Sequence, residues 1–274
     1  AKSIVDIASS NSQFSTLVAA LNKANLASTL QGGGPFTVFA PTNDAFADLL
    51  ADLGVSSLDD LSAEALTPIL LYHVVSGKVL STDLSNGYVG TLSSGPGQTK
   101  ISLQVQTDGV VLNGSSEVTS ADIMASNGVI HVINKVLLPP TVVDLAVNNP
   151  DFSILVQAVV KADLAGTLSG TGPFTVFAPT NAAFEALFAQ LGVSGIADLS
   201  KEQLVPILLY HVVSGNVLSG QLSTGDVATL NGDIAVNVGS SVTINGSASV
   251  VLANVQGSNG VVHVIDKVLL PPAK

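Results

Sequence analysis

The sequence has no cysteine, no arginine and no tryptophan among its 274 residues. Without cysteine the chain cannot form a disulfide bond or offer a thiolate to a metal ion. Without arginine it lacks the planar guanidinium group that binds phosphates and guanine bases through paired hydrogen bonds. The 9 basic residues are all lysines, and 20 acidic residues outnumber them to give a formal net charge of −11. This balance argues against a nucleic acid partner and against an anionic membrane surface.

Aromatic residues are also scarce, at 4% of the chain, whereas apolar residues make up 47%. The hydrophobic core must therefore be built mainly from valine, leucine, isoleucine and alanine. The high apolar content argues against an intrinsically disordered chain. No apolar run approaches the ~18 to 20 residues that a membrane-spanning helix needs, so we expect no transmembrane segment.

Two blocks of ten residues occur twice in the sequence. GPFTVFAPTN at residues 34–43 recurs unchanged at residues 172–181, and PILLYHVVSG at residues 68–77 recurs at residues 206–215. Both pairs are separated by 138 positions (172 − 34 and 206 − 68). Identical blocks in the same order and at one offset indicate an internal duplication.

A third block follows in each copy. SNGVIHVINKVLLPP at residues 126–140 reappears as SNGVVHVIDKVLLPP at residues 258–272, now 132 positions later (258 − 126), so the second copy is six residues shorter between blocks (138 − 132). Each copy is long enough to bury a core of its own, unlike the short units of a solenoid. The duplication therefore predicts two tandem domains, residues 1–139 and residues 140–274, joined at a proline pair.

The first half of each unit has the periodicity of helices. Phe14, Leu17, Val18 and Leu21 fall at positions i, i+3, i+4 and i+7, which is the spacing of an amphipathic helix. A short run of β-forming residues at 35–40 comes next and predicts a strand. Within one unit we therefore expect a helix that is followed along the chain by a strand.

Cap residues and a proline mark the two helices that follow this strand. Thr42 and Asn43 have side chains that cap a helix, and this role is favoured over contact with a ligand. A later helix is expected to start at Ser62 and to run to His73, with Pro68 kinking or splitting it.

The second half of each unit changes to the period of strands. Apolar residues alternate with polar ones over 101–105, and the run 129–136 reads as a buried strand. Asn113-Gly114 and Asn245-Gly246 have the sequence of tight hairpin turns. Helices followed mostly by strands predict an α+β fold, in which an antiparallel sheet packs against a layer of helices.

The three repeated blocks resemble the fasciclin (FAS1) domain. TVFAPTN followed by AF is similar to the first conserved box of that family, NGVIHVI with KVLLP is similar to its second box, and YH between them is similar to its Tyr-His motif. The resemblance covers nearly the whole chain. It implies two modules, each a wedge-like β-sandwich packed against several α-helices, and it implies no common catalytic activity. It also implies a protein that is secreted, periplasmic or on the cell surface.

In animal matrix members of this family, the Tyr-His motif and an Asp-Ile pair are linked to adhesion. The resemblance places candidate adhesion contacts at Tyr72 with His73, at Asp122 with Ile123, and at Tyr210 with His211. The second copy departs from this pattern because it reads Ala253-Asn254-Val255 where the first reads Ala121-Asp122-Ile123. A contact that depends on the carboxylate would therefore be confined to the first unit.

Each of these residue types also has a structural interpretation. The four histidines lie two per unit, which raises a metal or acid–base hypothesis, but His73 continues an apolar helical stripe and His131 alternates in phase with buried strand positions. A buried neutral histidine that bonds to the backbone is the favoured interpretation. Asn113 and Asn245 also begin N-glycosylation sequons, but the turn is the favoured interpretation, and glycosylation would require a eukaryotic secretory route. We therefore expect no catalytic residue, no cofactor and no metal site.

Two functions remain open from the sequence. The first is an adhesion or binding protein that uses its modules to bind an extracellular protein or a polysaccharide, with two modules giving avidity. The alternative is a protein that binds a lipophilic small molecule, such as a carotenoid, in an apolar groove, which some fasciclin-domain proteins are implied to do.

Overall fold

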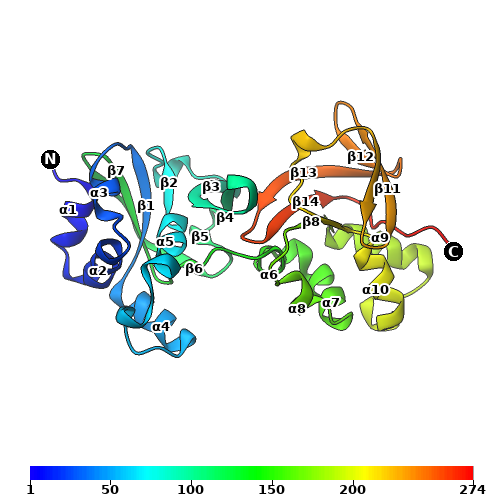
Figure 1. Cartoon of the computed structure of the whole chain (residues 1–274), viewed down its shortest axis with the longest axis horizontal. Helices are drawn as coiled ribbons and strands as arrows, with labels where there is room; N and C mark the ends of the chain where they lie inside the picture. The colour runs from blue at the N-terminus through cyan, green and yellow to red at the C-terminus, as the bar shows by residue number, and fades with distance from the viewer. Residues whose placement is uncertain (274) are drawn as a thin grey trace. The chain divides into compact units, whose positions relative to one another are not determined.

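A computed structural model describes residues 1–273 of the chain (Figure 1). It contains two compact units, the first formed by Ala1–Ser94 and Lys100–Pro139 and the second running on from Pro140. Within each unit the helices come from the first half of the sequence and most of the strands come from the second half. Both units therefore have the expected α+β organisation.

Five helices form the helical layer of the first unit. They are α1 (Ile4–Ser9), α2 (Ser15–Lys23), α3 (Ala27–Gln31), α4 (Asn43–Leu53) and α5 (Ala63–Tyr72).

Two neighbouring residues start two different helices. The Oγ1 atom of Thr42 accepts the N–H of Ala45 at 3.3 Å and caps α4. Asn43 reaches back to α2, where its Oδ1 accepts the N–H of Thr16 at 2.9 Å and its Nδ2 donates to the carbonyl of Ser12 at 2.9 Å. Asn43 thus supplies the cap that the first residues of α2 lack locally.

Helix α5 is continuous through Pro68, so of the kink or split expected there the split does not occur. The helix runs from Ala63 to Tyr72 with the proline inside it, and the Oγ of Ser62 caps its first turn. Pro68 is the sixth of the ten residues of α5, where it removes one backbone hydrogen bond of the helix. The apolar face of α5, which includes the buried Leu66 and Leu70, continues across it.

Seven strands form the mixed sheet of the first unit, in the order β2-β1-β7-β6-β5-β4-β3. Only β1 and β7 pair in parallel, and the other neighbours are antiparallel. The strands are β1 (Phe36–Pro41), β2 (Val74–Ser76), β3 (Gly87–Ser94), β4 (Lys100–Gln106), β5 (Val111–Leu112), β6 (Ser116–Ala125) and β7 (Gly128–Ile133). The buried run expected at 129–136 therefore ends as a strand at Ile133.

Strand β6 joins the two halves of this sheet. Its first residues pair with β5 and its later residues pair with β7, with register shifts between Val118 and Ser120 and between Ser120 and Ile123. Such bulges bend a strand. One apolar core lies between the helices and β1 with β7, and a second core brings residues of β1 and β7 together with residues of β4 and β5. The result is a sandwich with helices on its outer side, as the family resemblance implies.

The second unit repeats this arrangement. Its helices are α6 (Val142–Val147), α7 (Ser153–Lys161), α8 (Ala165–Leu168), α9 (Asn181–Leu191) and α10 (Lys201–Leu209). Its sheet has the order β10-β11-β12-β13-β14-β8-β9. The strands are β8 (Phe174–Pro179), β9 (Val212–Ser214), β10 (Gly225–Thr229), β11 (Gly232–Val238), β12 (Val242–Ile244), β13 (Ala248–Gln256) and β14 (Gly260–Ile265), with β8 and β14 parallel.

Short 3-10 turns connect these elements. They are η1 (Ser12–Phe14), η2 (Leu58–Asp60), η3 (Ser81–Asp83), η4 (Pro96–Gln98), η5 (Pro150–Phe152), η6 (Ile196–Asp198) and η7 (Ser219–Gln221). Within residues 1–273 we find no helix with the length and apolar character needed to cross a membrane.

Candidate functional site

The side chains of the Tyr-His motif are inside the first unit. Tyr72 has no exposed surface and His73 is 2% exposed. The Tyr72 hydroxyl donates to the carbonyl of Ser102 at 2.7 Å, and it accepts a hydrogen bond from Nδ2 of Asn113 at 2.9 Å. Burial raises the pKa of the Tyr72 phenol. The Tyr72 phenol therefore has a structural role, and it stays protonated and hydrogen-bonded within the core.

His73 connects the end of α5 to the segment after β7. Its Nδ1 lies 2.7 Å from the carbonyl of Ile69, and its Nε2 lies 2.9 Å from the backbone N–H of Leu137. Because the Leu137 N–H can only donate, Nε2 is the acceptor and Nδ1 carries the proton. Burial lowers the pKa of His73 to about 4, so the ring is neutral at physiological pH.

The second unit repeats both contacts. The Tyr210 hydroxyl donates to the carbonyl of Asp233 at 2.9 Å and accepts from Nδ2 of Asn245 at 3.0 Å. His211 lies 2.7 Å from the carbonyl of Ile207 and accepts the N–H of Leu269 at 2.9 Å, and burial lowers its pKa to about 4. The sequence interpretation of His73 and its counterpart as buried, backbone-bonded histidines agrees with these contacts.

The two Asn-Gly pairs form turns. Asn113 and Gly114 have φ values of +48° and +73°, and Asn245 and Gly246 have values of +52° and +71°. These are the conformations for which Asn-Gly pairs are favoured in hairpins. Asn113 is buried, and the Nδ2 atom that a glycan would modify is bonded to the tyrosine in each unit.

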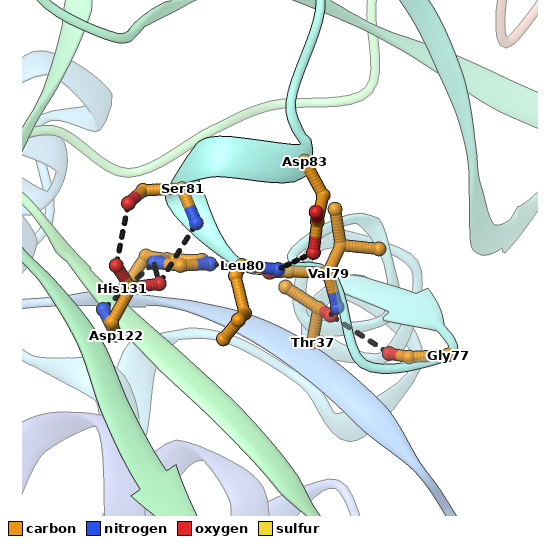
Figure 2. A network of polar contacts seen from close by, with 8 residues as sticks. All are labelled: Thr37, Gly77, Val79, Leu80, Ser81, Asp83, Asp122 and His131. Atoms are coloured by element: carbon orange, nitrogen blue, oxygen red, sulfur yellow. Dashed lines mark hydrogen bonds and ion pairs between the residues drawn. The ribbon is translucent and has the colours of Figure 1, made fainter.

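Asp122 lies at the centre of a second network, shown in Figure 2. Its Oδ1 accepts the N–H of Ser81 at 2.8 Å, and its Oδ2 accepts the Ser81 hydroxyl. These bonds lower the pKa of Asp122. The side chain remains 37% exposed, so it is the one polar candidate in this unit that solvent reaches. Ile123, next to it, is half-buried against the helical core.

The buried His131 completes this network (Figure 2). Its Nδ1 accepts the N–H of Asp122 at 3.2 Å, and its Nε2 donates to the carbonyl of Val79 at 2.8 Å. The Thr37 hydroxyl accepts the N–H of Val79 at 2.8 Å and donates to the carbonyl of Gly77 at 2.7 Å. Together these bonds fasten residues 77–81 to strands β1, β6 and β7.

The same network is present in the second unit with an amide in place of the carboxylate. Asn254 accepts the N–H of Ser219 at 2.8 Å and donates to the Ser219 hydroxyl at 2.8 Å. Its own N–H donates to Nδ1 of His263 at 3.1 Å, and His263 lies 2.8 Å from the carbonyl of Val217. Ser81 and Thr37 were not singled out from the sequence, although both recur as Ser219 and Thr175, and this recurrence was the available signal.

No three histidine, cysteine or acidic side chains come together as a metal site in residues 1–273. An apolar pocket in the helical core of the first unit has a volume of about 10 Å³, which is space for one water-sized molecule. This pocket is therefore too small for a lipophilic ligand, which leaves the surface grooves as the places where such a ligand could bind.

Each unit has a larger groove at an equivalent place. In the first unit it lies between α4 and residues 135–138 and has a volume of about 400 Å³. In the second unit it lies between α9 and residues 267–270, with Asn245 and Ser247 also in its wall, and has a volume of about 470 Å³. We call these the first groove and the second groove. Both volumes fall in the range of ligand-binding clefts.

Comparisons with known proteins agree with this architecture. Protein sll1483 of Synechocystis sp. is 48% identical over 133 residues, which are 48% of this chain and 74% of that protein. Transforming growth factor-beta-induced protein ig-h3 of Sus scrofa is 32% identical over 248 residues, 88% of this chain and 35% of that protein. Periostin of Homo sapiens is 31% identical over 253 residues, 90% of this chain and 30% of that protein. The chain thus spans about a third of the length of these two animal proteins.

A solved structure and a family model identify the repeated unit. The FAS1 domain pair from the insect cell adhesion molecule Fasciclin I matches with a TM-score of 0.51 over 92% of each chain, at 22% sequence identity, which shows a shared fold. The model of the fasciclin domain matches residues 12–139 and residues 150–271. The chain therefore belongs to the fasciclin family and carries two fasciclin (FAS1) domains in tandem.

Proposed function

We propose that this chain is a non-catalytic adhesion or binding protein that works outside the cytoplasm, either secreted, periplasmic or on the cell surface. In this proposal its two domains bind an extracellular protein or a polysaccharide through their surfaces.

One observation carries the proposal. All four histidines and the two motif tyrosines are buried and bonded within their own domains. A general acid or base must reach a substrate, and these groups face the protein interior instead. What recurs on the outside of both domains is a groove, which is suited to binding.

The relatives support the same class of function. The solved domain pair comes from an insect cell adhesion molecule, Fasciclin I, and the fasciclin family is generally non-catalytic. Because the chain covers only a part of the two animal proteins, their whole activity does not transfer to it. Two domains on one chain would also raise the apparent affinity for a surface that presents many copies of a partner.

The test is an attachment assay with the complete chain. The protein is coated on a surface, and retention of cells and of extracellular polysaccharides is measured against an albumin-coated surface. Soluble chain added in excess should compete with the coated chain and reduce retention. If no cell type or polysaccharide is retained above the albumin control, adhesion is the wrong function.

A further inference from the structure

The first groove has a wall that the Tyr-His motif holds in place. One side of the groove is α4, and the other side is the segment 135–138 that follows β7. Within that segment the N–H of Leu137 donates to Nε2 of the buried His73, and the Leu137 side chain is buried in the second core of the domain. The second groove is built in the same way through His211 and Leu269. The groove is therefore a fixed feature of the domain.

Exposed leucines accompany the groove in both domains. Leu138 lines the first groove and is 45% exposed, and Leu270 lines the second groove and is 39% exposed. The helix that forms the wall also ends in an exposed leucine, Leu53 in α4 and Leu191 in α9. Large apolar side chains exposed at the same places in both copies make this face suited to contact with a partner.

The two grooves differ in charge. Asp48 and Asp52 line the first groove, and the equivalent positions in the second groove are Ala186 and Gln190. A lysine is common to both grooves, Lys135 in the first and Lys267 in the second. Among residues 1–273 no ion pair within 4.0 Å joins Lys135 to either aspartate. Both carboxylates of the first groove are therefore available to pair with a cationic group of a partner.

The placement of Asp48 and Asp52 is unfavourable for the helix itself, whereas Asp44 lies in the first turn, where a carboxylate is favourable. Asp44, Asp48 and Asp52 follow each other at four-residue spacing on α4, and all three are exposed. Like charges at this spacing repel and weaken a helix. Since α9 has a neutral residue at each corresponding position, the fold does not need the carboxylates.

We infer that the first groove binds a basic segment of a protein partner, with lysine or arginine beside Asp48 and Asp52 and an apolar side chain beside Leu49 and Leu138. This inference rests on the proposed function and names the chemistry of its partner. Cationic groups next to apolar side chains are typical of proteins, and polysaccharides do not offer them together. The net charge of −11 attracts such a segment from a distance, and the groove gives it a place to bind.

The probe is a short labelled peptide with one leucine between two lysines, titrated against the complete chain by fluorescence anisotropy. Replacing the acids with the residues of the second groove, D48A with D52Q, should weaken binding by about threefold to tenfold, the effect of losing two exposed ion pairs. The reverse change, A186D with Q190D, should add a second site and double the stoichiometry. Higher salt should weaken binding in both cases.

A control with the same loss of charge is D108N with D226N, since both residues are exposed and lie outside the groove. It should bind the peptide nearly as well as the original chain. The inference fails if the groove variant and this control bind equally well, or if a peptide with glutamate in place of lysine binds as tightly.

If the chain does not bind the peptide while the coated chain still retains cells, adhesion stands and uses another surface. If peptide binding holds while attachment fails, adhesion itself is wrong.

Discussion

Asp122 and Asn254 occupy equivalent positions in the two domains and make the same contacts there. Both have a left-handed backbone, with φ of +59° and +63°, and both donate their N–H to a buried histidine. Both side chains accept the N–H of a serine, Ser81 or Ser219, at 2.8 Å. The framework therefore requires an oxygen acceptor at this position and does not require a charge.

This equivalence predicts different outcomes for two substitutions at Asp122. Asp122→Asn should leave the melting temperature of the first domain almost unchanged, because the amide keeps the oxygen that Ser81 binds. Asp122→Ala should lower it, because the N–H of Ser81 loses its acceptor. Thermal unfolding followed by circular dichroism compares the two. Equal melting of both variants would show that the contact with Ser81 does not matter.

The same two variants separate a structural role of Asp122 from a role of its carboxylate in adhesion. Attachment that survives Asp122→Asn does not use the carboxylate, whereas attachment lost in this folded variant does use it.

The bonds from Ser81 lower the pKa of Asp122. Their contribution to the stability of the fold is therefore present above the unfolded pKa of ~3.9, and it disappears as the pH falls through the lower folded pKa. The Asp122→Asn variant should not show this loss of stability in acid.

Acid should destabilise both domains through His73 and His211. Burial lowers both folded pKa values to about 4, whereas an unfolded histidine titrates near ~6.5. Between these values the unfolded chain binds protons that the folded chain excludes, so stability is full above about pH 6.5 and falls until about pH 4. The difference amounts to about 3 kcal/mol per histidine.

Urea unfolding across this pH range measures the effect of the two histidines. The free energy of unfolding should decline from pH 7 to pH 4.5, and His73→Gln, although less stable at pH 7, should remove the part of the decline that belongs to the first domain. A flat profile of the original chain between pH 7 and pH 5 would contradict the buried, neutral assignment.

Tyr72 and Asn113 should be energetically coupled. Tyr72→Phe leaves Nδ2 of Asn113 without its acceptor, and Asn113→Gly keeps the turn while removing the side chain; each should cost about 1–3 kcal/mol of stability. The double variant should cost clearly less than the sum, because the second change removes a partner that is already unpaired. Additive costs would mean that the bond contributes nothing. Asn245→Gly should cost less than Asn113→Gly, since Asn245 is exposed.

These contacts show where sequence reasoning reaches its limit. The turn at Asn113 was predictable because it depends on the Asn-Gly pair alone. The bond from Asn113 to Tyr72 spans 41 residues and depends on the finished fold. Asn43 was expected to cap the helix that follows it, yet its side chain caps α2, 27 residues earlier, because Thr42 already caps α4. Local chemistry predicts the elements, and the fold decides which of them a polar side chain connects.

The Thr37 hydroxyl should control how firmly residues 77–81 are held. Thr37→Val keeps the shape of the buried side chain but removes the acceptor of the Val79 N–H and the donor to Gly77, at a cost of about 1–3 kcal/mol. Amide hydrogen exchange of Val79 and Ser81 should accelerate in this variant, and Thr37→Ser, which retains the hydroxyl, should protect them. Unchanged exchange in Thr37→Val would mean that Asp122 and His131 hold the segment without it.

Gly128 should tolerate no side chain, because β7 and β1 approach each other closely at this residue. A Cβ atom there would lie 1.9 Å from the carbonyl oxygen of Phe36 and 2.9 Å from Cδ1 of Ile4, and the φ of +157° is one that other residues rarely adopt. The oxygen belongs to the backbone of a buried parallel strand pair, so relief would require the two strands to separate. Gly128→Ala should therefore cost more than ~3 kcal/mol or prevent the first domain from folding.

Gly166→Ala is the matched control, since Gly166 lies within α8 with open space around it. Alanine there should add up to ~1 kcal/mol of stability. Urea unfolding of both variants decides the matter, and a Gly128→Ala protein as stable as the original would mean that β1 and β7 are not paired as described.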